Sequence, residues 1–96
     1  MKIIDIQDLN DSICIIGDSN DAKPVYENGK IISGTCIQRF ENIEGKSPLM
    51  LVNFDENAAT FIVLHDCIPK IDNNGIMLKK GEKISVASSG IVTIIK

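Results

Sequence analysis

The chain has 96 residues, enough for one modest hydrophobic core, and its 44% hydrophobic and 24% charged residues exclude a disordered chain. A net charge of −3, three Phe, one Tyr and no Trp count against a nucleic-acid-binding protein, which usually carries a basic patch and rings for stacking bases. We therefore expect one globular domain over residues 1–96.

The first part of the chain predicts two strands. Residues 2–6 alternate between apolar and polar positions well enough for a strand. The short apolar run 13–16 stops at the polar residues 17–21, which predicts a strand that is buried on both faces.

A hairpin and a further strand are expected next. Asn28-Gly29 stands between two short β-prone runs within residues 24–32, and both residues accept the positive φ angles of a type I′ turn. Residues 35–40 alternate as a half-exposed strand does, and the polar stretch 41–48 predicts a loop.

The middle of the chain allows two interpretations. Residues 49–54 predict a strand, but the acidic residues after it could cap a helix, and some apolar residues in 54–65 have helical spacing. The β-branched and aromatic content of residues 60–64 favours a strand instead, with 55–57 as the preceding turn. We expect the strand over the helix within residues 55–66.

The last quarter, residues 75–96, has the clearest pattern of the chain. Apolar runs at 76–78, 84–86 and 91–95 are separated by turn residues at 79–81 and 88–90, which predicts a three-stranded meander. Such a sheet needs a second apolar layer to cover it. The whole pattern predicts an all-β domain over residues 1–96, a small β-sandwich or Greek-key barrel of about seven or eight short antiparallel strands.

Three cysteines and one histidine are the candidates for site chemistry. Cys14, Cys36 and Cys67 are an odd number at wide spacing, without a C-x-x-C motif, which is typical of free thiols in a reducing compartment. His65 and Cys67 would share a face of a strand and could bind zinc if Cys36 or Cys14 lay nearby. Buried cysteines that pack as small hydrophobic residues are the commoner outcome, and a hydrolase built on a cysteine and His65 lacks an evident orienting acid. We expect no metal site.

Other polar clusters predict turns rather than sites. Asp18 and Asn20 hold the first and third positions of a calcium loop, but Gly29 stands where the bidentate Glu is needed. The lysines near residues 79–83 predict a solvated turn, and no glycine pattern for binding phosphate is present. We expect no catalytic residue and no cofactor.

No membrane span or secretion signal is predicted. Asp5 interrupts the apolar residues at the start of the chain, and residues 61–64 form the longest strictly aliphatic or aromatic run.

The second half of the chain, residues 49–96, resembles small bacteriophage virion proteins, namely capsid decoration and fibre-base modules. In residues 75–96 an apolar strand meets a basic turn, Gly81-Glu82 leads into an alternating strand, and a small-residue turn precedes a final aliphatic strand. Residues 51–53 followed by 58–60 are similar to the preceding strand pair of such modules. The resemblance implies a protein without catalytic residues that binds the capsid lattice or another virion protein, often as a homotrimer.

We therefore expect a non-enzymatic structural protein, a capsid decoration or virion-associated protein that is assembled in the host cytoplasm and located in the virion. Its partners would be other protein subunits, with neither membrane nor nucleic acid involved. The alternative is an intracellular small-barrel binding module, such as a host-protein inhibitor or an oligonucleotide-fold protein. Contact surfaces are expected at exposed edge strands or near Phe40 and Phe54.

Overall fold

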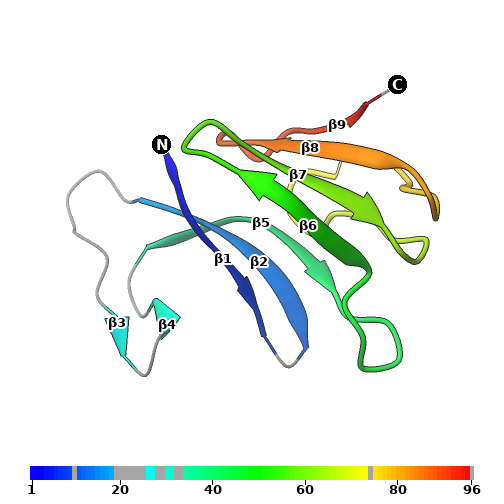
Figure 1. Cartoon of the computed structure of the whole chain (residues 1–96), viewed down its shortest axis with the longest axis horizontal. Helices are drawn as coiled ribbons and strands as arrows, with labels where there is room; N and C mark the ends of the chain where they lie inside the picture. The colour runs from blue at the N-terminus through cyan, green and yellow to red at the C-terminus, as the bar shows by residue number, and fades with distance from the viewer. Residues whose placement is uncertain (10, 19–25, 28–29, 32–33, 74, 96) are drawn as a thin grey trace.

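The computed structural model describes all residues except 10, 19–25, 28–29, 32–33, 74 and 96 (Figure 1). The described strands are β1 (Ile3–Asp8), β2 (Ser12–Gly17), β3 (Tyr26–Glu27), β4 (Lys30–Ile31), β5 (Thr35–Glu41), β6 (Leu49–Phe54), β7 (Ala58–Val63), β8 (Lys83–Ala87) and β9 (Val92–Ile95).

Seven of these strands form two antiparallel sheets. The sheet β1-β2-β5 has three strands and the sheet β6-β7-β8-β9 has four, and β3 pairs with β4 in a separate short hairpin. The two sheets lie as separate layers in Figure 1, and their inner faces share one core. No helix occurs among the described residues. The predicted all-β sandwich is confirmed.

The predictions for the first half hold for the residues that the structure describes. Every residue of the central strand β2 is buried, with Ile13 and Ile15 in the core, as the short apolar run predicted. Tyr26 pairs with Ile31 across the predicted hairpin. Its expected tip, Asn28-Gly29, lies outside the described residues.

The two interpretations of residues 55–66 are resolved in favour of the strand. β7 alternates between buried and half-buried residues, with Ala59, Phe61 and Val63 facing the core. The turn before it forms because the Asp55 carboxylate accepts hydrogen bonds from the N–H groups of Asn57 and Ala58, at 2.8 and 3.1 Å.

One predicted strand of the last quarter is wrong. β8 and β9 form as expected, but residues 76–78 make only a single bridge, between Leu78 and Cys67. The third strand of the meander is β7, because the turn after Leu78 pairs with Val63. The Val63 N–H donates to Glu82 O and the Val63 C=O accepts from Gly81 N, both at 2.8 Å.

The core between the sheets is almost wholly aliphatic. Phe40 and Phe61 are its two largest fully buried side chains, one from each sheet. The cluster of buried residues consists of Ile3, Ile13, Ile15, Ile37, Phe40, Leu49, Ala59, Phe61, Val63, Cys67, Leu78, Ile84 and Val86.

A buried glutamine on β5 ties the two sheets together. The Gln38 side chain is 0% exposed. Its Nε2 donates to Ile71 O at 2.6 Å and to Gly90 O at 3.0 Å, while its Oε1 accepts from Ile71 N at 2.9 Å. One amide therefore holds the loop before β8 and the turn before β9 against the other sheet.

The turn between β8 and β9 approaches the backbone of β5 closely at Gly90. Gly90 has φ 93°, and a Cβ built there would lie 2.6 Å from Ile37 O. A side chain is excluded both by the backbone angle and by the neighbouring carbonyl.

Replacing Gln38 by Met keeps the volume and removes the hydrogen bonds, leaving backbone groups of Ile71 and Gly90 unpaired. We expect the free energy of unfolding in urea to fall by about 2–3 kcal/mol. The matched control is Gln7→Met, because Gln7 Nε2 is buried without a hydrogen-bond partner among the described residues. It should leave stability unchanged or raise it, and equal losses in the two variants would contradict the role of Gln38.

Comparing Gly90→Ala with Gly81→Ala separates the cost of the close approach to Ile37 O from the cost of a positive φ angle. Both glycines have φ 93°, but no atom lies within 4 Å of a Cβ at Gly81. Gly81→Ala should cost about 1–2 kcal/mol through the left-handed backbone alone. Gly90→Ala should cost about 1–3 kcal/mol more through overpacking against Ile37 O. Urea unfolding of both variants checks this, and equal costs would show that the approach is relieved by a small backbone shift.

Candidate functional site

The cysteines and the histidine do not form one site. Cys14 and Cys36 lie on the neighbouring strands β2 and β5, whereas Cys67 belongs to the core cluster and His65 is exposed. β7 ends at Val63, so the expectation that His65 and Cys67 share a strand face is wrong. Among the described residues, no group of three or more His, Cys, Asp or Glu side chains could hold a metal ion.

Cys14 and Cys36 are close neighbours, and both are free thiols. The Cys14 thiol lies near enough to Cys36 to raise its pKa, and Cys36 Sγ donates to Gln38 O at 3.3 Å. Ser12 Oγ lies 3.8 Å from Cys14 Sγ. The pair is part of the packing of β2 against β5.

The thiols of Cys36 and Cys67 are poor nucleophiles. Burial, reinforced by the neighbouring Cys14 thiol, raises the pKa of Cys36 to about 12. Burial and the Asp66 carboxylate raise the pKa of Cys67 to about 11. The thiolate is the reactive form, so neither group is activated at neutral pH.

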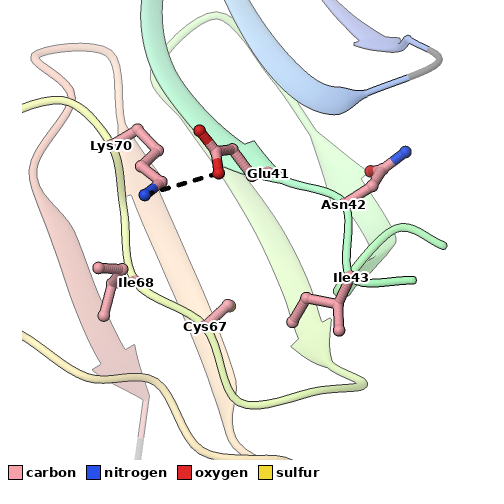
Figure 2. Close-up of a pocket in the computed structure, with 6 residues that line it drawn as sticks. All are labelled: Glu41, Asn42, Ile43, Cys67, Ile68 and Lys70. Atoms are coloured by element: carbon pink, nitrogen blue, oxygen red, sulfur yellow. Dashed lines mark ion pairs between the residues drawn. The ribbon is translucent and has the colours of Figure 1, made fainter. Parts of the chain in front are cut away.

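A small hollow lies where the loop after β5 meets the loop after β7 (Figure 2). Its volume is about 160 Å³, below the roughly 300 Å³ of a typical small-molecule pocket. Lys70 Nζ lies 3.7 Å from Glu41 Oε2 and reaches across the hollow. The two charges satisfy each other, and the nearby Cys67 is a protonated thiol, so the hollow lacks an activated group. Its lining residues are Glu41, Asn42, Ile43, Cys67, Ile68 and Lys70.

In the lysine-rich turn before β8, Lys79 and Lys80 interact with Asp66 of the same chain. The Lys80 N–H donates to Asp66 Oδ1 at 2.8 Å, and Lys79 Nζ lies 3.6 Å from Asp66 Oδ2. This hydrogen bond and the adjacent Lys79 lower the pKa of Asp66. Of the residues considered for a calcium loop, Asp18 is described and accepts a hydrogen bond from Lys2 N at 2.6 Å, whereas Asn20 and Gly29 lie outside the described residues.

The outer face of the four-stranded sheet is the most distinctive surface of the described residues. The strand registers place four residues in each of two rows across β6, β7, β8 and β9, and all eight are half-buried or exposed. We call these two rows the outer face. The first row is Met50, Ile62, Lys83 and Ile95, and the second is Asn53, Thr60, Ser85 and Thr93.

The outer face is nearly uncharged. Lys83 is its single charged residue, although 24% of the chain is charged. Asn, Thr and Ser side chains form the second row and can hydrogen-bond to a partner without the cost of burying an ion. Alternation within each strand could have indicated these residues from the sequence, but the rows depend on strand registers that no single strand reveals.

The edge strand β6 carries most of the exposed large apolar side chains of the sheet. Met50, Leu51, Val52 and Phe54 are 50%, 39%, 47% and 40% exposed. The expectation of a contact surface near Phe54 agrees with this exposure. The same expectation for Phe40 is wrong, because Phe40 is 0% exposed in the core.

The sequence matches no protein-family model, and no curated protein or solved structure matches it. Among the described residues, no helix is long and apolar enough to cross a membrane. The geometry of the described residues and the strand-and-turn pattern are thus the basis for a functional proposal.

The raised thiol pKa values predict slow modification of the folded protein. At pH 8, Cys67 should react with an aromatic disulfide reagent about a hundredfold more slowly than in the urea-unfolded chain, and Cys36 about a thousandfold more slowly, because the thiolate fraction falls as the pKa rises. Peptide mass spectrometry would assign the rates, and the reactivity of Cys67 should recover as the pH approaches 11. Modification of either residue at the unfolded rate at pH 8 would contradict this.

Proposed function

We propose that this chain is a non-enzymatic structural protein that attaches to a protein assembly through the outer face. The observation that carries the proposal is the nearly neutral pair of residue rows across β6, β7, β8 and β9. The resemblance of residues 49–96 to virion modules supports the particular assembly, a bacteriophage capsid. The protein is then a capsid decoration or virion-associated protein that joins the particle in the host cytoplasm.

The chemistry of the outer face fits protein contact. The centres of protein interfaces are depleted in charged residues and combine apolar with neutral polar groups. Ile62 and Thr60 on β7 and Ser85 on β8 are half-buried by their neighbours, so they lose little rotamer freedom when a partner covers them. The outer face of a sheet also presents these groups in rows across the strands.

A decoration protein needs a rigid surface rather than reactive groups. It stabilises an assembly because it binds a site that only the assembled state offers, and many identical sites add up over one particle. Gln38 fixes the turn before β9 against β5, which holds one edge of the four-stranded sheet in place. Such a module can bind without a large change of shape.

The oligomeric state and the alternative function complete the proposal. The resemblance implies a homotrimer, and this oligomeric state rests on the resemblance alone. The alternative function, an intracellular binding module that inhibits a host protein or belongs to the oligonucleotide-fold proteins, would also act through a surface. The two functions differ in whether assembled shells bind the protein.

Binding to shells tests the proposal directly. Shells assembled from the major capsid protein of the genome that encodes this chain, prepared without this protein, would be mixed with it and sedimented. Ser85→Glu places a bulky carboxylate in the middle of the outer face, where a partner would have to bury its charge, and we expect it to weaken binding by about tenfold or more. Ser89→Glu is the matched control, because Ser89 is exposed in the turn between β8 and β9.

Each outcome decides between the two functions. Co-sedimentation of the unaltered protein and of Ser89→Glu, with loss for Ser85→Glu, supports attachment through the outer face. Equal binding of all three proteins would mean that another surface attaches. A genome without a capsid protein, or shells that leave the protein in the supernatant, would refute the virion role and favour the intracellular module.

A further inference from the structure

The edge strand β6 lacks the charged residues that usually protect sheet edges, although its pairing with β7 is irregular between Leu51 and Asn53. The two sheets end in four edge strands, β1, β5, β6 and β9. β1 contains Asp5 and Asp8, and β5 contains Arg39 and Glu41, whereas β6 and β9 contain no charged residue. Charged residues on an edge prevent pairing with another chain. β6 has six residues against four in β9, so it is the longest uncharged edge among the described strands.

The backbone of β6 is open beyond its first residue. Ser47 Oγ donates to Leu49 O at 2.9 Å and accepts from Leu49 N at 3.3 Å. Leu49 pairs with Val63, whose own N–H and C=O bond to Glu82 and Gly81, so Leu49 directs its polar groups to the open edge. By the alternation of an antiparallel ladder, Leu51 directs its N–H and C=O to the same edge.

Apolar side chains accompany these backbone groups. Met50, Leu51, Val52 and Phe54 are each between 39% and 50% exposed. With a full surface of about 150–200 Å² per side chain, they expose roughly 300 Å² together. Met50 lies on the outer face, whereas Leu51 and Phe54 pair with the core-facing Phe61 and Ala59, so the exposed apolar area flanks the β6 backbone on both faces of the sheet.

We propose that the occupant of this edge is β6 of a second copy of the chain, paired antiparallel about a two-fold axis near Val52. The two strands then match in length, and neither brings a charge into the pairing. The result is a continuous eight-stranded sheet, because each copy contributes its four-stranded sheet. Such an isologous contact closes on itself and gives a dimer, in place of the homotrimer that the resemblance implies.

The charges that flank β6 favour this antiparallel arrangement. The nearest charged residue before β6 is Lys46, and the nearest after it are Asp55 and Glu56. Antiparallel pairing places the Lys46 end of each copy beside the acidic end of the other. Lys2 lies 3.6 Å from Glu56 and neutralises part of that end, so Asp55 carries the remaining charge. Glu44 lies farther from β6, in the turn between the bridged residues Ile43 and Lys46.

Pairing of β6 with β9 of a second copy is less favourable. β9 is two residues shorter, as the lengths of six and four show. Its last residue, Ile95, pairs with Lys83. An antiparallel β6 would bring Lys46 to that end of β9, so two cations would lie on the same side of the contact. The β6–β6 arrangement avoids this repulsion.

The expected affinity is moderate. A stable interface of standard size buries about 800 Å² per partner, more than the apolar strip of β6 supplies alone. Backbone hydrogen bonds and the flanking loops add polar contact area, so we expect a reversible dimer with a dissociation constant of about 10–100 μM.

Sedimentation velocity of the full chain from about 5 to 500 μM measures this equilibrium. We expect monomer and dimer with the full chain. Val52→Lys should raise the dissociation constant about tenfold or more, because an edge lysine prevents strand pairing. Ile91→Lys adds the same charge at a residue that is 63% exposed and outside β6, and it should leave the equilibrium unchanged. A protein that stays monomeric at 500 μM, a trimer, or a dimer that tolerates Val52→Lys would overturn the proposal.

Crosslinking tests the two-fold axis itself. A residue near such an axis lies beside its own copy, so Val52→Cys should give a covalent dimer with a short bismaleimide. The unaltered chain reports the background of its native thiols, and Ile91→Cys is the matched exposed control. Crosslinking of Val52→Cys no greater than that of Ile91→Cys would overturn the arrangement. Ser85 lies on β8, two strands away from β6, so Ser85→Glu tests shell binding without altering the β6 edge, and failure of one experiment is distinguishable from failure of the other.

Discussion

The Gln38 amide is the polar interaction on which the joining of the two sheets depends. Aliphatic burial drives the sheets together but does not specify how one lies on the other, because apolar contact is non-directional. Gln38 adds direction, since its Nε2 and Oε1 bond to backbone groups of Ile71 and Gly90 that only one arrangement brings within reach. The close approach of Gly90 to Ile37 O lies beside these bonds. A buried amide with its partners in place thus gives the core a single register.

The local patterns predicted most strands because each carries its own chemistry. The apolar run in β2 and the Asp55 turn before β7 needed no knowledge of distant residues. Residues 76–78 have the sequence of a strand, yet only Leu78 forms a β-bridge, with Cys67. The backbone of Val63 pairs instead with Gly81 and Glu82 in the turn that follows. Gln38 could not be recognised from the sequence, since its partners are backbone groups 33 and 52 residues away. The same limit applies to the outer face, whose rows arise only when four strands adopt their registers.

Among the described residues, the groups that stabilise the fold differ from the groups that are exposed for contact with a partner. The Cys67 thiol lies in the core, the Cys36 thiol lies beside Cys14 between β2 and β5, and the Glu41–Lys70 pair lies across a hollow too small for most ligands. The neutral side chains lie on the outside, on the outer face and along β6. A dimer through β6 would place two outer faces side by side in one surface, which would allow two neighbouring subunits of a symmetric assembly to be held together.

The span of the Gln38 hydrogen bonds also bears on how the chain folds as it is made. The sheet β1-β2-β5 is complete at Glu41, but the acceptors at Ile71 and Gly90 are synthesised 33 and 52 residues after Gln38. Before Ile71 is synthesised, the Gln38 amide has only the adjacent Arg39 N–H and water as partners. Before β7 is synthesised, Phe40 lacks the opposing Phe61. We infer that the first sheet stays loosely packed until the second sheet has been synthesised, which is the behaviour expected of a β protein rich in long-range contacts.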